Sequence, residues 1–179
     1  MRIILVGYMA AGKTTLGRAL GKAFNMPFYD LDWYISSRRH RNCEELFTEI
    51  GEEAFRHIEY NMLHEVAEFE NVVISCGGGT PCFFDNMEYM NQQAETFYLK
   101  ASPEILHAHL QMGKGVRPLL LDKTPQETAT FIRQQIVERE PYYNRAKHII
   151  DVNILNSDDK INFCVEKIRK LINRNQTVG

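Results

Sequence analysis

The sequence of 179 residues lacks several features that mark whole classes of protein. Basic and acidic residues nearly cancel, at 21 Lys and Arg against 23 Asp and Glu, so the composition predicts no attraction to nucleic acid or to an anionic membrane. No apolar run approaches the roughly 20 residues of a membrane span. Only four clearly apolar residues precede Gly7, too few for a signal peptide, so we expect a cytoplasmic protein.

Cysteine is also scarce, and its spacing excludes a further class. The four cysteines form no C-x-x-C pair, which argues against a zinc site, and we expect them to be reduced in the cytoplasm. The chain has no internal repeat, no low-complexity tract and no linker-like stretch. These absences predict one domain over residues 1–179.

The most informative stretch that is present is Gly7–Thr14, which matches the phosphate-loop pattern G-x-x-x-x-G-K-[ST]. The apolar run Ile3–Val6 before it predicts a buried strand, and Leu16, Leu20 and Phe24 after it recur at helical spacing. A loop in that position directs free backbone N–H groups and the positive end of a helix dipole at an anion. The stretch therefore predicts a site for a nucleoside triphosphate.

Within this loop, each residue type has an expected task. Lys13 is placed to reach the β- and γ-phosphates, and the Thr14 hydroxyl is a ligand for Mg²⁺, the expected cofactor. The predicted ATP-binding residues of the loop are Ala10, Ala11, Gly12, Lys13, Thr14 and Thr15.

Strand-like and helical patterns alternate along the chain. Strands are predicted at 3–6, 28–31, 72–76, 96–99 and 148–152, and helices near 13–25, 33–40, 44–69, 83–93, 102–112, 125–140 and 158–173. This alternation predicts an α/β fold in three layers, a central five-stranded parallel sheet flanked by helices. The stretch 112–124 interrupts the pattern with glycine, lysine, arginine and proline, and is predicted to be a mobile lid.

Two further groups follow predicted strands, at the edge where open α/β sheets bind ligands. Strand periodicity sends Asp30 and Asp32 to the same side, where one carboxylate can support hydrated Mg²⁺ and the other can accept a hydrogen bond from a substrate hydroxyl. The alternative is that they cap a helix beginning near Trp33. Gly77–Gly79 lets the backbone approach a ligand closely, although a flexible turn is the alternative interpretation.

The predicted helix 44–69 has an apolar face for the core, on which Phe55 and Val66 lie. Arg56 and Glu59 lie three residues apart on an adjacent face and are spaced to pair. Taken alone, such a pair is most simply a surface salt bridge.

Together these motifs resemble the shikimate kinase family over about residues 1 to 150. The motifs that carry the resemblance are the phosphate loop, D-x-D at Asp30–Asp32, G-E-x-x-F-R-x-x-E at Gly51–Glu59, G-G-G at Gly77–Gly79, R-P-L-L at Arg117–Leu120 and R-x-P-x-Y at Arg139–Tyr143. The resemblance implies a P-loop kinase fold and transfer of the ATP γ-phosphoryl group to the 3-hydroxyl of shikimate.

The resemblance also implies roles for individual residues. Shikimate contacts fall on Asp32, Arg56, Gly77, Gly78, Gly79 and Arg139, with Glu59 orienting Arg56 and a substrate-binding helical segment at about 31–62. Asp32 is expected to position the attacking hydroxyl. Lys13 and Arg117 are expected to neutralise charge on the transferring phosphoryl group, with Arg117 also contacting ATP, and Thr14 and Asp30 to serve the metal.

Two positions depart from the family pattern. Ala10 stands where glycine is usual, and we expect it to keep a negative φ so that nucleotide binding survives. Leu110 replaces an arginine that many members stack on adenine.

Two other functions share some of these features. A gluconate or nucleoside monophosphate kinase keeps the phosphate loop but does not need both Arg56 and Arg139 around Asp32. A nucleotide switch is expected to have a strand ending in Asp and a nucleobase motif, and neither is found. The expected partners are shikimate and ATP, and a monomer is favoured because no spare apolar stripe is evident.

Overall fold

The computed structural model describes residues 1–112, 124–153 and 157–176. All five strands predicted from the sequence are present: β1 (Arg2–Val6), β2 (Phe28–Asp30), β3 (Val72–Ser75), β4 (Glu95–Lys100) and β5 (His148–Asp151). The helices are α1 (Lys13–Phe24), α2 (Leu31–Arg39), α3 (Cys43–Ala67), the 3₁₀ turn η1 (Thr80–Cys82), α4 (Asn86–Gln93), α5 (Pro103–Met112), α6 (Pro125–Tyr143) and α7 (Asp158–Gln176).

The strands form one parallel sheet in the order β2-β3-β1-β4-β5. Ile4 at the centre of β1 lies opposite Ile74 of β3 and Thr96 of β4, and all three are fully buried. The five-stranded parallel sheet predicted from the sequence is therefore confirmed. Because parallel strands all end at the same edge, the loops that follow β1, β2 and β3 are neighbours.

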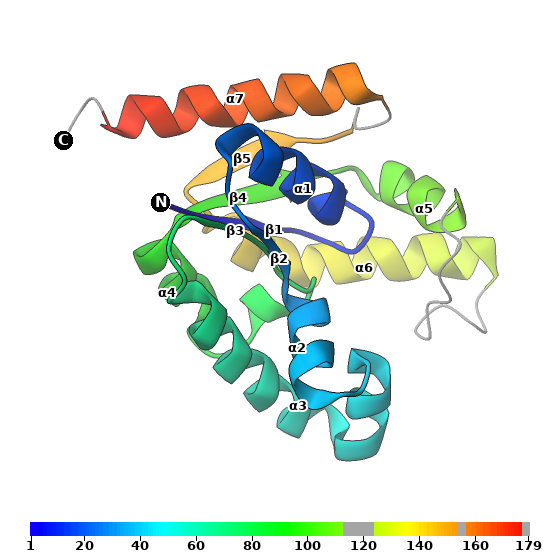
Figure 1. The fold of residues 1–179 in the computed structure, drawn as a ribbon. Coiled ribbons are helices and arrows are strands. Elements are labelled where there is room, and N and C mark those ends of the chain that lie inside the picture. The colour runs from blue at the N-terminus through cyan, green and yellow to red at the C-terminus, as the bar shows by residue number, and fades with distance from the viewer. Residues whose placement is uncertain (113–123, 154–156, 177–179) are drawn as a thin grey trace.

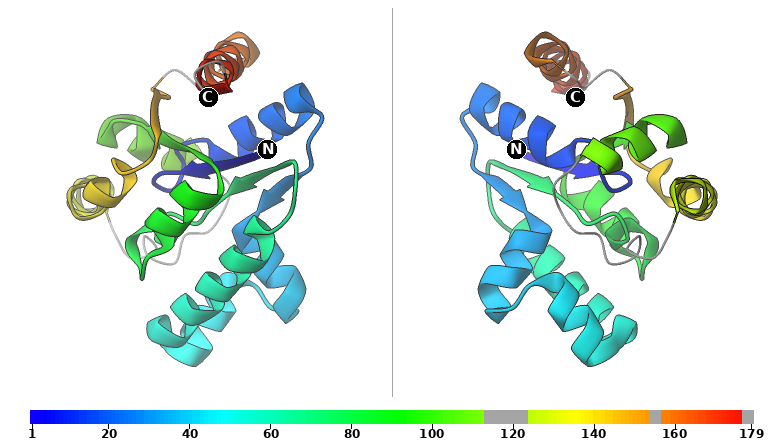
Figure 2. Two further views of the ribbon diagram at one scale, coloured as in Figure 1. Left: turned by 90° about the vertical axis from the view of Figure 1, so that its left-hand side faces the viewer. Right: turned by 90° about the vertical axis from the view of Figure 1, so that its right-hand side faces the viewer.

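Helices cover both faces of this sheet, which gives the three layers that were expected. Figure 1 shows α1 and α7 together over one face and α4 and α6 beneath the other. The pair α2 and α3 projects from the β2 side of the sheet, as both side views in Figure 2 show. Among the described residues, no helix has both the length and the apolar character needed to cross a membrane.

Helices α2 and α3, which follow β2, differ from the expectation in their form. Helix α2 begins at Leu31 rather than near Trp33, because the Asp30 carboxylate caps it by accepting a hydrogen bond from the Asp32 N–H. The segment 44–69 is not one regular helix, because Gly51 inside α3 has φ 78° and ψ 169° and kinks it. A positive φ of this kind favours glycine, so Gly51 fixes where the helix bends.

Candidate active site

The phosphate loop joins β1 to α1 as predicted. Gly12 precedes the helix with φ 86°, and α1 begins at Lys13, so the unpaired N–H groups of its first turn face the loop. The Lys13 Nζ donates to the backbone carbonyls of Gly7 and Tyr8, both at 2.8 Å, and so lies across the mouth of the loop. The loop therefore places a cation beside a helix N-terminus, and both attract an anion.

Ala10 in this loop does not have the expected backbone conformation. Its φ is +62°, in the left-handed region, so the expectation of a negative φ is wrong. The conformation costs an alanine roughly 1–2 kcal/mol. The loop path requires this turn, and the Ala10 carbonyl oxygen lies 3.1 Å from His109 Nδ1 on α5. The contact with His109 on α5 thus helps to hold Ala10 in this conformation.

Asp30 and Asp32 lie beside the phosphate loop, as predicted, but strand periodicity is not what places them there. Asp30 ends β2 and caps α2, and Asp32 lies in the first turn of α2, so the expectation that strand periodicity directs both side chains is wrong. The Thr14 hydroxyl donates to Asp30 Oδ2 at 2.9 Å, which ties α1 to the end of β2. Capping and a site role coincide, because Asp30 uses one carboxylate oxygen for each contact.

These groups surround a cavity of about 620 Å³. Its lining residues come from the ends of β2 and β3, the loops after β1 and β3, the first turns of α1 and α2, and α5: Met9, Ala10, Gly12, Lys13, Thr14, Thr15, Asp30, Asp32, Ser75, Cys76, Gly77, Gly78, His109 and Met112. Of the predicted loop residues, Ala11 does not line the cavity and is buried in the core. A second cavity, of about 530 Å³, lies around Arg41–Glu49 and holds none of the predicted site residues.

The Asp32 carboxylate has an unusual environment within the cavity. It is open to the cavity, yet the surrounding protein atoms crowd it, and this desolvation raises its pKa from 3.8 to about 6. The negative charges of Asp30 and Glu59 act in the same direction, while Lys13 and Arg56 oppose them. A carboxylate with this pKa is ionised at neutral pH and is a better proton acceptor than an ordinary aspartate.

The Gly77–Gly79 loop lies against the other predicted site residues. A Cβ on Gly77 would lie 3.0 Å from both Asp32 Oδ1 and Glu59 Oε1. A Cβ on Gly79 would lie 2.7 Å from Arg56 Nη2, and one on Gly78 3.6 Å from Arg139 Nη1. The close approach to Arg56 explains why glycine is needed at position 79, so the flexible-turn interpretation is insufficient.

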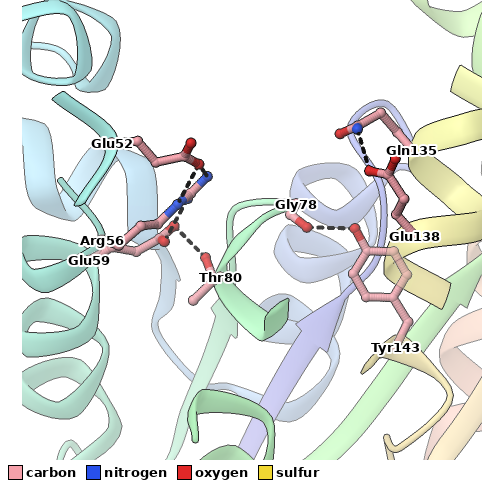
Figure 3. Close-up of polar contacts among 8 residues, drawn as sticks. All are labelled: Glu52, Arg56, Glu59, Gly78, Thr80, Gln135, Glu138 and Tyr143. Carbon is pink, nitrogen blue, oxygen red and sulfur yellow. Dashed lines mark hydrogen bonds and ion pairs between the residues drawn. The ribbon is translucent and has the colours of Figure 1, made fainter. Parts of the chain in front are cut away.

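The predicted pair of Arg56 and Glu59 is confirmed, and it is not a surface salt bridge. The two side chains are 12 % and 2 % exposed, and Arg56 Nη1 lies 2.9 Å from Glu59 Oε2. The other Glu59 oxygen accepts a 2.6 Å hydrogen bond from the Thr80 hydroxyl, and Glu52 also contacts Arg56 at 3.1 Å. Figure 3 shows this chain of contacts running from α3 to the glycine loop.

Aromatic rings complete the surroundings of Arg56. Its guanidinium lies 4.2 Å from the Phe83 ring centre, and Phe47 and Phe55 lie 6.0 and 5.5 Å away. No site role was predicted from the sequence for Phe83, Thr80 or Glu52. Thr80 directly follows the three glycines and Glu52 lies one turn before Arg56, so both positions carried a weak signal.

Arg139 comes to the site from α6. It lies over the Tyr8 ring at 5.7 Å and next to Gly78. Arg117 and the stretch 113–123 of the predicted lid lie outside the described residues. Trp33 is not a core residue, because it is 53 % exposed and Arg18 lies over its ring at 5.0 Å. Leu110 is half-buried against the core.

A phosphate loop that shares one cavity with a carboxylate of raised pKa, next to two arginines, is suited to phosphorylating a small anionic acceptor. The fold and this cavity define a P-loop kinase of small molecules. The family model described as shikimate kinase matches residues 9–171. The chain belongs to the shikimate kinase family.

Individual relatives support the same assignment along the whole chain. A shikimate kinase of Bacteroides fragilis is 50 % identical, with 97 % of each chain covered. The crystal structure of the Bacteroides thetaiotaomicron shikimate kinase superposes with a TM-score of 0.94 at 49 % identity, covering 97 % of this chain and 98 % of that one. A shikimate kinase from Acinetobacter baumannii in complex with shikimate has a TM-score of 0.84 at 30 % identity, with 97 % and 93 % covered.

The reaction follows from the family. The enzyme transfers the γ-phosphoryl group of ATP to the 3-hydroxyl of shikimate, giving shikimate 3-phosphate and ADP, a step of chorismate and aromatic amino-acid biosynthesis. The gluconate-kinase and nucleotide-switch alternatives are thereby set aside.

Proposed function

We propose that the site divides into a nucleotide half, on the phosphate loop, and an acceptor half, around the glycine loop. The observation that carries this proposal is the position of Gly77–Gly79, whose backbone lies against Asp32, Arg56, Glu59 and Arg139 at once. Gly77 and Gly78 also line the cavity that contains Lys13. An acceptor bound there lies within reach of a nucleotide phosphate.

In the nucleotide half, the backbone N–H groups around Ala10–Thr15 bind the phosphates of ATP, and Lys13 neutralises charge on the group being transferred. The contacts of Lys13 with the Gly7 and Tyr8 carbonyls support this role, because they hold the ammonium over the loop. Arg117 is proposed to contact ATP and the transferring phosphoryl group, because it belongs to the family motif R-P-L-L. It lies in the proposed lid at about 112–124, which closes over the site.

We further propose Mg²⁺ as the metal, held through Thr14 and Asp30. The hydroxyl and the carboxylate lie 2.9 Å apart, and oxygen atoms are the ligands that Mg²⁺ prefers. In the described part of the chain, no group of three or more His, Cys, Asp or Glu side chains is placed to hold a metal ion, so phosphate and water would complete the coordination of Mg²⁺. When bound, Mg²⁺ supplies charge neutralisation between the phosphates.

In the acceptor half, Arg56 and Arg139 bind the carboxylate of shikimate, and the Gly78 N–H binds a further oxygen. Two guanidinium groups can hold a carboxylate through charge-assisted hydrogen bonds. Glu59 orients Arg56 through the 2.9 Å contact. Asp32 accepts the hydrogen bond of the attacking 3-hydroxyl and, with its pKa near 6, takes up the proton as the phosphoryl group transfers.

The same proposal covers the larger organisation. We place the substrate-binding segment at about 31–62, which corresponds to α2 and most of α3, within one domain over residues 1–179. These helices project from the sheet (Figure 2). The enzyme is proposed to act as a cytoplasmic monomer.

Steady-state assays of ADP release test the division into halves. Replacing Arg56 with Ala is expected to raise the KM for shikimate at least tenfold and to leave the KM for Mg·ATP within twofold, because Arg56 belongs to the acceptor half and its contacts with other described residues lie outside the phosphate loop. Arg38→Ala is the matched control, because Arg38 also pairs with a glutamate of α3 but lies exposed on α2. An effect of Arg56→Ala confined to the KM for ATP would show that the acceptor half is assigned wrongly.

A further inference from the structure

Tyr143 is a fully buried side chain that contacts the proposed acceptor half of the site. It is the last residue of α6, and its hydroxyl donates to the Gly78 carbonyl oxygen at 2.5 Å (Figure 3). Arg139 lies four residues earlier on the same helix, so both side chains are on one face. One helix turn therefore carries an acceptor-binding arginine and an anchor for the glycine loop.

The hydroxyl of Tyr143 remains a donor over the working pH range. Burial raises its pKa above the usual range, and the neighbouring Cys82 thiol acts in the same direction. Arg139 opposes them by hydrogen bonding to the phenol oxygen. A phenol in this environment stays protonated and donates its hydrogen to the Gly78 carbonyl.

The bond fixes one peptide unit of the loop. The Gly78 carbonyl belongs to the peptide between Gly78 and Gly79, and each of these residues lies against a different arginine. Arg139 Nη1 lies 3.6 Å from a Cβ position on Gly78, and Arg56 Nη2 lies 2.7 Å from one on Gly79. Rotation of that peptide would change the space available to both guanidinium groups.

The loop is tied on its other side as well. The Thr80 hydroxyl donates to Glu59, which in turn holds Arg56 on α3. The loop is thus anchored to α6 through Tyr143 and to α3 through Thr80, so the two arginines are spaced by a short segment fixed at both ends. Figure 3 shows these two anchors on opposite sides of the loop.

We propose that Tyr143 is a positioning residue for the acceptor, which sets the Gly78–Gly79 peptide and Arg139 relative to Arg56 so that both arginines meet one carboxylate. This inference rests on the proposed acceptor half of the site. Tyr143 touches neither reactant and acts through Gly78 and Arg139. Its loss affects shikimate binding and leaves the phosphate loop as it is.

Tyr143→Phe tests this role, because it keeps the ring in the core and removes only the hydroxyl. We expect the KM for shikimate to rise about tenfold, as for one buried hydrogen bond whose acceptor is left unpaired, with the KM for Mg·ATP within twofold of wild type. Tyr98→Phe is the matched control, since its ring lies 5.1 Å from that of Tyr143 but its hydroxyl meets Glu140 at 3.5 Å. Placing 4-aminophenylalanine at position 143 restores a donor and is expected to lower the KM again.

Arg139→Lys separates failure of this inference from failure of the acceptor site. If Arg139→Lys raises the KM for shikimate and Tyr143→Phe does not, the role of Tyr143 is overturned while the site stands. If neither does, both proposals fail. If Tyr143→Phe raises the KM for shikimate and the KM for Mg·ATP equally, Tyr143 has a general packing role and the inference is overturned. The same holds if Tyr98→Phe raises the KM for shikimate as much as Tyr143→Phe does.

A second measurement tests the inference if the Tyr143→Phe protein does not fold. 3-Fluorotyrosine placed at position 143 alone keeps the hydroxyl and reports its surroundings by ¹⁹F NMR. Saturating shikimate is expected to shift this resonance, and ADP alone is expected to leave it in place. If saturating shikimate leaves the resonance unshifted, the Tyr143 hydroxyl is not coupled to acceptor binding and the inference is overturned.

Discussion

Glu59→Gln is a small change with a large expected effect, because it removes one charge from a buried pair and nearly preserves shape. The best orientation of the amide keeps its oxygen toward Arg56 and turns its NH₂ to the Thr80 hydroxyl, which can accept instead of donating. The geometry survives, but Arg56 loses its buried counter-charge. Among the described residues, the salt bridge that then remains to Arg56 is with Glu52, whose side chain is 55 % exposed.

The magnitude follows from this burial. Breaking a buried ion pair costs about 3–5 kcal/mol, and the retained hydrogen bonds and Glu52 reduce the loss to about 2 kcal/mol. With an unfolding entropy of about 2.1 cal/mol/K for each residue, a 179-residue chain loses about 5 °C of Tm. The KM for shikimate should rise with it, because Arg56 is held less firmly once its buried counter-charge is lost.

Calorimetry of Glu59→Gln against Glu65→Gln provides the test. Glu65 lies on the same helix and also pairs with an arginine, Arg38, but the two side chains are 33 % and 56 % exposed. Glu65→Gln should therefore cost less than about 1 kcal/mol. Equal losses in the two variants would refute the reasoning that burial makes the Arg56 pair costly to break.

Four further predictions concern the nucleotide half and Asp32. Lys13→Ala should lower kcat by about 100-fold or more in a folded protein, measured by coupled ADP release; near-normal turnover would contradict the phosphate-loop assignment. Ala10→Gly should raise Tm by about 1–2 °C, because relief of the left-handed strain exceeds the added chain entropy, whereas Ala11→Gly, with no such strain, should lower it. Since ionised Asp32 is the proposed proton acceptor, kcat/KM for shikimate should fall as the pH drops below about 6. The same raised pKa makes the folding stability of the ligand-free protein depend on pH in the opposite direction to its activity. Asp32 contributes stability below about pH 4, where it is protonated, and this contribution is lost as the pH rises through 6. Urea titrations of Asp32→Asn should lack this pH-dependent part of the free energy of unfolding.

The sheet could be predicted from the sequence because each strand is a short apolar run between recognisable helices. Ile3–Val6 and Val72–Ile74 are fully buried, as their composition indicated. The details that failed depend on single backbone choices. The Asp30 cap competes with strand continuation, and Gly51 lies inside a helical pattern whose periodicity alone does not reveal the kink.

The candidate site was predictable where chemistry is concentrated in motifs, and less so where support comes from long-range contacts. The Arg56 and Glu59 pair follows from helical spacing, but its burial and its link to Thr80 depend on how α3 packs against the glycine loop. The Tyr143 bond to Gly78 joins residues 65 positions apart. Local pattern carries no information on such a contact, nor on the positive φ that the loop path gives Ala10.

In the proposed acceptor half, the double pairing of Arg56 makes acceptor binding an exchange of anions. The guanidinium is already paired with Glu59 and with Glu52, the more exposed of the two. A carboxylate that binds Arg56 in this scheme replaces Glu52, so the gain is only the difference between two similar contacts. The proposal therefore predicts weak binding of a simple monoanion such as acetate. An anion that also reaches Arg139 would gain a second cation, and acids would be discriminated by the number of cations that each can reach.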